Sequence, residues 1–404
     1  MDGSPLDGAA FLILIISAFV VLFRRRLNWP YVVLENWPIF LFYFFLLVSV
    51  LWANSPPVSF KRWFKEFGNI AILLVILTEQ NPQQAIRAVF VRCAYLLFPL
   101  SVIFIRFFPS VGRYYSSHGG EGEFTGVTMQ KNSLGALVLI CGLIILWDWL
   151  ELRRTSKGVR VLRKIKISHW GLLLIGAYLF RMCNSVTSMV CFAIGAAIIL
   201  TGQLPVLRRR LQMLAVIAAI CVGGFWVLDQ TFGLKKAFFE DMGRNMTLTG
   251  RTDVWQELCN VGTDPFLGTG FMSFWDDQHF QSKLPDWVAF SAHNGYLEIL
   301  LAGGWVGVSF LSLMILGVGW RVSRALPSGT NYSAVRFAIF VVALVANYTE
   351  SNFAEMTPLG FLFLLGGIGS VMPSPMNVHV TSGEEEFDDM NEPESVTGHP
   401  LPCE

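Results

Sequence analysis

Long apolar stretches separated by shorter polar ones follow one another along the chain as far as about residue 371. Most are long enough to cross a bilayer, whose hydrocarbon core of about 30 Å needs roughly 17–25 residues of helix. Two stretches, at 64–78 and 168–182, are short, so a total of ten or twelve transmembrane helices is also compatible with the pattern. The pattern predicts an all-α polytopic membrane protein with about eleven transmembrane helices, at residues 9–23, 31–53, 64–78, 85–107, 132–150, 168–182, 184–201, 211–228, 293–320, 333–349 and 356–371.

Composition agrees with this pattern and excludes several other classes of protein. Of the 404 residues, 53% are hydrophobic and only 15% are charged, whereas a soluble domain has about a quarter charged residues. The net charge of +1 gives no field that would attract nucleic acid. Of the seven cysteines, only Cys259 falls in the largest polar segment, so no disulfide is expected there. Internal repeats, a P-loop and a dinucleotide fingerprint are absent from the sequence.

Basic residues mark alternate loops and therefore one face of the membrane. They lie at Arg24–Arg26, in the run 153–166, at Arg208–Arg210, and at Arg321, Arg324 and Arg336. Cytoplasmic loops carry such an excess, so this face is expected to be cytoplasmic, although Lys61, Arg62 and Lys65 run against the rule. The first helix follows Asp2 and Asp7 and precedes arginines. That order is opposite to a secretory signal, which predicts an uncleaved helix with its N-terminus outside.

These assignments divide the chain into four parts. An N-terminal transmembrane bundle covers 1–228, and a large periplasmic loop before the ninth helix covers 229–292. The C-terminal transmembrane helices cover 293–371. The rest, 372–404, contains GEEEFDDMNEPES and is expected to be a disordered acidic cytoplasmic tail.

The large outer loop contains most of the unusual polar residues. Its stretches NMTLTGRTDVWQELC (245–259) and DPFLGTGFMSFWDD (264–277) precede SAHNGYLE, which enters the next apolar span. DVWQEL is helix-like, with Thr249 or Thr252 as its cap, which places Arg251 at a helix start. FLGTG predicts a turn in which Gly268 and Gly270 leave backbone N–H groups exposed.

The outer face therefore offers groups suited to a phosphate. A helix N-terminus has partial positive charge, and an arginine beside it adds a bidentate fork. The second outer loop, 107–135, adds Arg113, and Lys131 follows at the entrance of the next span. With the imidazole of His293 on the same face, these residues predict a site for an anionic lipid head group with a hydroxyl nearby. Asn294 is expected to contact sugar there or to cap the helix.

Each of these residues also has a purely structural interpretation. His293 is suited to an interfacial hydrogen bond, Arg113 to an interface anchor, and Lys131 to reaching the head groups from a span end. Glu298 is better explained by a packing contact than by catalysis. Glu350, with the two residues after it, is a candidate for lining the same cavity.

A metal site is not expected. Trp275-Asp276-Asp277 and His279 are weak evidence, since a divalent cation needs several converging carboxylates and one Asp-Asp pair in an aromatic loop does not supply them. We therefore expect no metal and no cofactor.

The series GRTDVW…PFLGTGFMSFW…AHNGYLEILLAGGWVGV resembles the core domain of the O-antigen ligase and Wzy-type polymerase superfamily. Upstream, FPSVGR…FTGVTMQKNSLGALVLICGLIILW and SVLWANSPPVSFKR resemble its branch of ExoQ-like exopolysaccharide polymerases. The likeness covers roughly residues 40–320. It implies a GT-C-like membrane glycosyltransferase, inverting and metal-independent. Such an enzyme transfers a glycan from undecaprenyl pyrophosphate to an acceptor sugar on the periplasmic side of the bacterial inner membrane.

The resemblance also implies roles for single residues. His293 matches a histidine proposed as general base, Arg251 matches a pyrophosphate-binding arginine, and Arg113 matches a second arginine in a more variable loop. Fixed guanidinium groups suit the charge on a departing pyrophosphate, and histidine suits proton transfer near neutral pH. Two departures are visible. Gln130 replaces a histidine common among relatives, so no base role belongs there. Against the twelve spans that family members often have, we expect an initial one to be missing from this sequence.

Several functions remain open at this level. A polymerase uses a lipid-linked glycan as acceptor and a ligase uses a lipid A core sugar; the upstream loop favours the polymerase. A lipid-linked sugar transporter or flippase belongs to a different class, but transporters usually place polar residues near mid-membrane, often in internal repeats. A structural member of a secretion complex is a third possibility. Expected partners are the lipid-linked donor, the glycan acceptor and other polysaccharide assembly proteins.

Overall fold

A computed structural model describes residues 5–115, 122–155, 160–205, 210, 251–285, 287–288, 291–353, 355–369 and 371. The span expected at 211–228, the first part of the large outer loop and the acidic tail lie outside these residues. Within them the chain is helical apart from one short hairpin, in which β1 (Arg113–Tyr114) pairs antiparallel with β2 (Glu123–Phe124).

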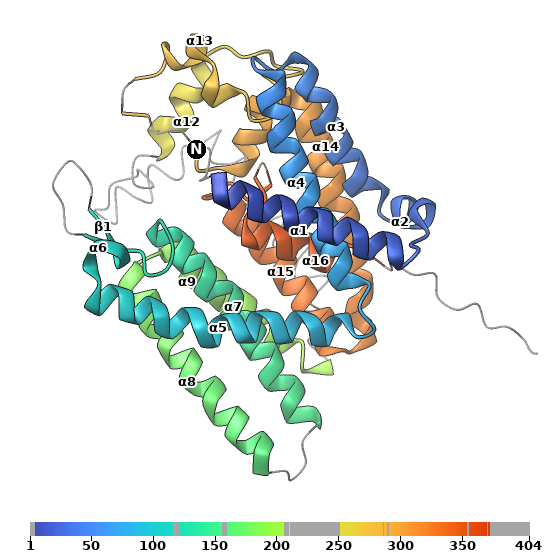
Figure 1. Cartoon of the computed structure of the whole chain (residues 1–404), viewed down its shortest axis with the longest axis vertical. Helices are drawn as coiled ribbons and strands as arrows, with labels where there is room; N and C mark the ends of the chain where they lie inside the picture. Colours follow the sequence, from blue (N-terminus) through green and yellow to red (C-terminus); the bar gives the residue numbers. More distant parts are fainter. Residues whose placement is uncertain are drawn as a thin grey trace, which may run out of the picture. The chain divides into compact units, whose positions relative to one another are not determined.

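The helices are shown in Figure 1. In chain order they are α1 Pro5–Arg24, α2 Trp29–Glu35, α3 Trp37–Ser49, α4 Pro56–Leu77, α5 Pro82–Phe107, α6 Pro109–Gly112, α7 Lys131–Thr155, α8 Arg160–Cys183, α9 Val186–Thr201, α12 Arg251–Asn260, α13 Gln278–Gln281, α14 Gly295–Ala325, α15 Asn331–Asn347 and α16 Pro358–Gly367. Three 3₁₀ turns, η1 Val50–Trp52, η2 Phe274–Asp276 and η3 Leu326–Ser328, complete the regular structure.

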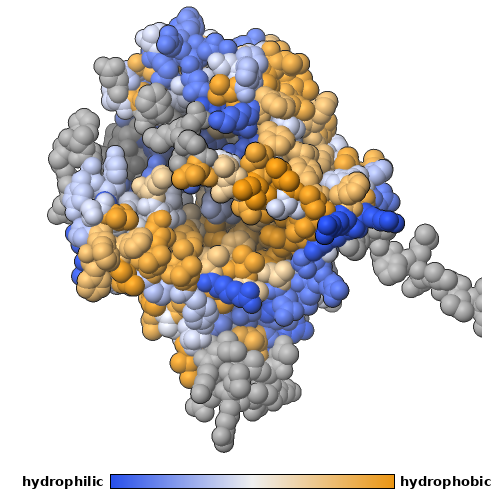
Figure 2. All heavy atoms as spheres, viewed as in Figure 1, coloured by the Kyte–Doolittle hydropathy of each residue, from blue (hydrophilic) through white to orange (hydrophobic). Residues whose placement is uncertain are grey.

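The helices are those of a polytopic membrane protein. Among the described residues, four helices are long and apolar enough to cross a membrane, or five if the bent pair α2–α3 is one span. The same residues hold four shorter apolar helices, at Ile167–Cys183, Val186–Thr201, Asn331–Asn347 and Pro358–Gly367. Figure 2 shows apolar surface over α1 and α5 and polar surface over the α12–α13 segment. The count of eleven spans stays a prediction.

The span expected at 31–53 is broken rather than continuous. Its two parts, α2 and α3, meet at 95°, and Asn36 lies fully buried at the corner. The Asn36 side chain donates to Val32 O, while its Oδ1 accepts from Arg321 Nη1 at 2.9 Å and from Gly369 N at 2.8 Å. A buried amide with all these partners fixes the corner, because leaving any of them unpaired inside the protein is costly.

Polar contacts gather at the two ends of the helices. At one end Arg25 pairs with Glu79 at 2.6 Å, and Asn331 donates to Glu151 at 2.7 Å. Helix α7 begins at the opposite end, with Asn132 in its first turn, and finishes with Arg153 and Arg154 in its last. Arg153 and Arg154 share this end with Arg25, because Arg87 in α5, a few residues after Glu79, pairs with Asp148 near the end of α7.

Helix α14 is interrupted within its apolar sequence. Gly304 has φ +57° and ψ −158°, a conformation that essentially only glycine adopts. The break frees backbone groups that a membrane protein must pair internally. The PFLGTG segment supplies the partners. Thr269 N donates to Leu301 O and Gly270 N to Ala302 O, both at 2.9 Å. In return, the amides of residues 305 and 306 donate to the carbonyls of residues 265 and 266.

This pairing corrects one expectation about the FLGTG turn. Gly268 and Gly270 have positive φ values of 62° and 90°, as the turn requires. Their N–H groups are not exposed, however. Gly268 N donates to Asp264 O at 3.0 Å and Gly270 N to the broken helix. The turn is a connector that fills a helix break, so the predicted exposure of its N–H groups for an anion is wrong.

The same outer segment is also fastened to α4. Arg62 donates to Met272 O at 2.6 Å and pairs with the Asp276 carboxylate. The Asn54 amide donates to Ser273 Oγ at 2.8 Å. Arg62 runs against the positive-inside rule, and its pairing with an acidic residue of the outer segment explains why the chain tolerates it there.

Candidate functional site

The start of α14 holds His293 in an unusual backbone conformation. Its φ is +47°, in the left-handed region that side chains other than glycine rarely adopt. Asn294, the next residue, caps the helix, because its Oδ1 accepts from Tyr296 N at 3.0 Å and Leu297 N at 3.3 Å. Asn294 is buried and its oxygen is engaged, so its predicted contact with sugar stays a prediction.

Glu298 holds the turn that carries His293. Its carboxylate accepts from Ala292 N at 2.7 Å and from Trp275 Nε1 at 2.9 Å. His293 N donates in turn to Ser291 Oγ at 3.1 Å. The sequence favoured a packing contact for Glu298; in the structure its carboxylate ties the backbone just before the histidine to the helix that follows it.

Within the described residues, helix α12 begins at Arg251. Two contacts of Trp255 place this helix. Its Nε1 donates to Ala292 O at 2.8 Å, and its ring meets the edge of Tyr348 at 5.2 Å between centroids. Beneath them, Leu258 and Val261 pack with Phe274, Ala292, Leu297 and Leu301 in a small apolar cluster. The helix is thereby fixed beside the His293 turn.

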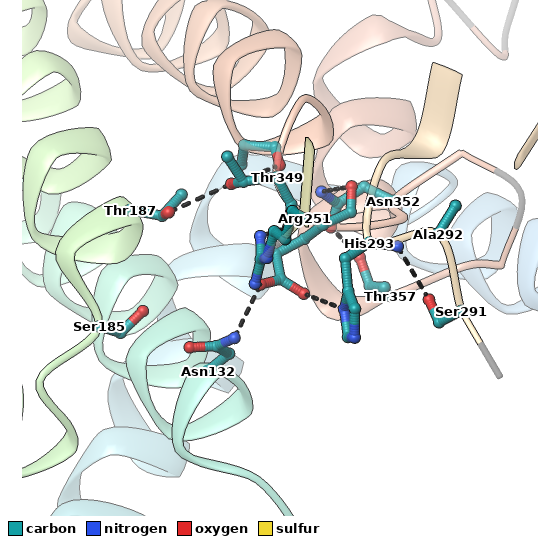
Figure 3. Close-up of polar contacts among 12 residues, drawn as sticks. Asn132, Ser185, Thr187, Arg251, Ser291, Ala292, His293, Thr349, Asn352 and Thr357 are labelled. Atoms are coloured by element: carbon teal, nitrogen blue, oxygen red, sulfur yellow. Dashed lines mark hydrogen bonds and ion pairs between the residues drawn. The ribbon is translucent and has the colours of Figure 1, made fainter. Parts of the chain in front are cut away.

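The two predicted residues meet at the carboxylate of Glu350. Arg251 Nη2 lies 3.0 Å from Glu350 Oε1, and Asn132 Nδ2 donates to the same oxygen at 2.9 Å. The other oxygen, Oε2, is 3.8 Å from His293 Nδ1. Figure 3 shows Asn132, Arg251 and His293 turned toward one another from three different elements. Residues widely separated in sequence thus form one polar cluster, defined here by Asn132, Arg251, His293 and Glu350.

The backbone around the cluster is held by further contacts. Arg251 Nη1 donates to Thr349 O, and Thr349 Oγ1 donates to Thr187 Oγ1 at 3.2 Å (Figure 3). Thr187 lies in the first turn of α9. The starts of α7, α9, α12 and α14 and the end of α15 therefore converge on this point.

The cluster is partly open to solvent. The Arg251 side chain is 17% exposed, Glu350 30% and His293 36%. Partial exposure suits a site that must admit a charged ligand, while enough water is excluded to leave the electrostatic interactions stronger than at an open surface.

Two other predicted site residues have partners elsewhere. The Arg113 guanidinium donates from Nε and Nη2 to Ile105 O at 3.2 and 3.0 Å, and lies 5.1 Å from the centre of the Phe124 ring. Lys131 Nζ pairs with Glu123 at 2.5 Å. In the part of the chain that the structure describes, neither side chain forms a hydrogen bond or ion pair with the cluster. Their substrate-binding roles stay predictions.

The acidic residues near α13 are used in local structure. Asp276 pairs with Arg62, and Asp277 caps α13 by accepting from His279 N at 2.9 Å. Over the described ranges, no three His, Cys, Asp or Glu side chains gather as a metal site would require.

Sequence reasoning named two members of the cluster and treated a third, Glu350, as a candidate lining residue. It assigned no role to Asn132, although this residue follows Lys131 at a helix entrance. The missing signal is tertiary, since 218 positions separate Asn132 from Glu350.

Comparison with known proteins gives these residues a context. Residues 125–312, including Asn132, Arg251 and His293, match the protein family described as O-antigen ligase. Over this segment the chain is similar to O-antigen ligases. It is also similar to the exopolysaccharide production protein ExoQ of Rhizobium meliloti (strain 1021), with 23% identity over 351 residues, 81% of this chain and 74% of that protein. These similarities, with the apolar helices, indicate a multi-pass membrane enzyme of polysaccharide assembly.

The matched segment does not contain the whole polar cluster. Three members of the cluster fall inside residues 125–312, whereas Glu350 lies beyond them. The carboxylate that joins the cluster thus comes from outside the segment that matches the O-antigen ligase family.

Proposed function

We propose that this protein, like the O-antigen ligases it resembles, transfers a glycan from undecaprenyl pyrophosphate to an acceptor sugar at the periplasmic face of the bacterial inner membrane. The transfer would be inverting and metal-independent. The observation that carries the proposal is the meeting of Arg251 and His293 on one carboxylate, at 3.0 and 3.8 Å. The Arg251 guanidinium group, which can bind phosphate, and the His293 imidazole, which can accept a proton, are then close enough to contact the same small ligand.

The chemistry requires both groups. An acceptor hydroxyl attacks C1 of the donor sugar while the bond from C1 to the pyrophosphate oxygen breaks, and its electron pair leaves with the pyrophosphate. Arg251 stabilises that developing charge, with Asn132 able to donate beside it. His293 takes the hydroxyl proton. Attack opposite the departing group inverts the configuration at C1.

Arg113, Lys131 and Asn294 are proposed to bind substrate around this centre. Arg113 would exchange Ile105 O for phosphate, and Lys131 would exchange Glu123. Lys131 needs little rearrangement, because its ion pair is about 40% exposed on each side and such pairs contribute only about 0–1 kcal/mol. The cluster lies at the end of the bundle away from Arg25 and Arg153. The positive-inside rule then supports a periplasmic site.

A polymerase is favoured over a ligase within this proposal. The likeness to an exopolysaccharide production protein spans 81% of the chain, which supports a second lipid-linked glycan as acceptor. A ligase acting on lipid A core shares the chemistry. A flippase is less well supported, although α14 is broken as transporter helices often are. The freed backbone groups of α14 pair with the PFLGTG segment and are not left to bind a substrate.

The experiment compares His293→Ala and Arg251→Ala with Arg25→Ala, whose side chain pairs with Glu79 at the opposite end. The first two variants should reach the membrane and make no elongated or transferred polysaccharide, with a loss on the order of 10²-fold or more. Arg25→Ala should behave as wild type. Normal polysaccharide ladders from either site variant would refute the assigned roles.

The material that accumulates in a deletion strain separates the two acceptors. Single repeat units on undecaprenyl pyrophosphate identify a polymerase. Full-length polymer on that carrier, with bare lipid A core, identifies a ligase.

A further inference from the structure

Glu350 occupies the place that an anionic ligand of this site would take. Its Oε1 accepts from both Asn132 Nδ2 and Arg251 Nη2, and its Oε2 lies 3.8 Å from His293 Nδ1. A carboxylate and a phosphate present similar pairs of oxygens to a guanidinium group. The charge of Arg251 is therefore already matched by a side chain of the same protein.

A pyrophosphate cannot join Arg251 while this carboxylate stays in place. Both are anions, and like charges a few ångströms apart in a partly buried site repel strongly. Pyrophosphate has the larger charge and more acceptor oxygens, so it is the stronger partner for the guanidinium group. Binding of the donor thus requires Glu350 to leave Arg251.

The backbone at Glu350 is fixed independently of its carboxylate. Glu350 N donates to Ala346 O at 2.9 Å. On one side Thr349 bonds to Thr187, and on the other Asn352 N donates to Asn347 Oδ1 at 2.9 Å. The carboxylate can therefore move by side-chain rotation alone. The neighbouring group within a short rotation is the imidazole of His293, now just beyond hydrogen-bonding distance.

We propose, on the basis of the function proposed above, that Glu350 exchanges between two partners. In the empty protein it binds Arg251 and so acts as a stand-in for pyrophosphate. When the donor's pyrophosphate takes Arg251, Glu350 accepts a hydrogen bond from His293 Nδ1. It is thus a positioning residue for His293 and a competitor for donor binding.

The exchange gives the reaction a defined proton path. With Nδ1–H held by Glu350, His293 Nε2 has a free lone pair to take the proton of the acceptor hydroxyl. The acceptor oxygen forms its bond to C1 as the C1–O bond to pyrophosphate breaks, and the electron pair remains on pyrophosphate. Glu350 stabilises the resulting imidazolium, which afterwards loses its proton to water.

The test measures binding and turnover separately, with the full chain in lipid nanodiscs. Glu350→Gln keeps the shape of the side chain and removes its charge. We expect it to bind undecaprenyl pyrophosphate about tenfold more tightly, since Arg251 is released, and to lower kcat about a hundredfold, since His293 loses its partner. Glu350→Ala should shift both quantities in the same directions. Glu79→Gln, in an ion pair at the other end of the bundle, is the matched control and should change neither.

Opposite shifts in affinity and turnover are the signature, because a carboxylate with a purely structural role would weaken both. Glu350 variants with weaker carrier binding, or with unchanged kcat, would overturn the inference. Carrier binding by the wild-type protein and by Arg251→Ala tests the proposed function itself. If wild-type protein binds no carrier, or Arg251→Ala binds it as well as wild type, the proposed function fails regardless of Glu350.

Discussion

Replacing Gly304 by alanine tests whether the break in α14 is required. The Cβ added at this position would lie 2.3 Å from both the carbonyl carbon and the carbonyl oxygen of Phe266. Both are backbone atoms of the PFLGTG segment and cannot turn away as a flexible side chain can. The φ of +57° and ψ of −158° are also unfavourable for alanine. Either the PFLGTG segment must be displaced, or α14 must become continuous through residue 304.

The magnitude follows from the contacts at the break. A non-glycine residue in such a conformation costs about 1–3 kcal/mol. Displacing Phe266 also removes the hydrogen bonds from the amides of residues 305 and 306 to the carbonyls of residues 265 and 266. Each such hydrogen bond contributes a net stabilisation of about 0.5–1.5 kcal/mol. We expect Gly304→Ala to lower the free energy of unfolding by roughly 2–6 kcal/mol. Because the first part of α14 carries the His293 turn, polysaccharide synthesis should fall as well.

Gly171 provides the matched control. It lies in α8, and a Cβ added there meets no atom within 4 Å. Gly171→Ala should leave the protein unchanged or stabilise it by up to about 1 kcal/mol, because alanine favours helix over glycine. Unfolding of both purified variants is followed by tryptophan fluorescence, and polysaccharide is measured in cells. Equal stability and equal synthesis in the two variants would refute the account of the break.

Two further predictions concern the outer segment. Glu298→Gln turns an amide N–H₂ toward Trp275 Nε1 or Ala292 N, two donors that need an acceptor. The loosened His293 turn should lower kcat on the order of 10²-fold and leave carrier affinity unchanged. An unchanged kcat would contradict the positioning role of Glu298. An impermeant maleimide added to intact cells should label the exposed Cys259, whereas Glu79→Cys in a Cys259→Ser background should be labelled only after permeabilisation. The reverse pattern would invert the proposed orientation.

Hydropathy predicted most of the helices, since a bilayer requires long apolar segments whatever their neighbours are. The expected 85–107 and 132–150 correspond to α5 and α7, each with a few more polar residues at an end. The corner at Asn36 was not predictable in this way. Its cause is the partnership of one amide with Arg321 and Gly369, which are distant in sequence.

In the candidate site, too, features set by local sequence were predictable and features set by tertiary contacts were not. Local signals placed His293 at the entrance of a span, which is confirmed, and Arg251 in a helix, where α12 has it as the first described residue. The wrong expectation about the FLGTG turn arose because its N–H groups find acceptors only where Gly304 opens another helix. The role of Glu350 as a bridge likewise depends on packing that no local pattern reports.

The hydrogen bonds between the PFLGTG segment and α14 also bear on how the chain reaches its native state. They run in both directions, from 269 and 270 to α14 and from 305 and 306 back to the segment. Neither piece has its full complement of partners until the other has arrived. We therefore expect the two to form and melt as a single cooperative unit, so that hydrogen exchange at 269–270 and at 305–306 should report the same opening event.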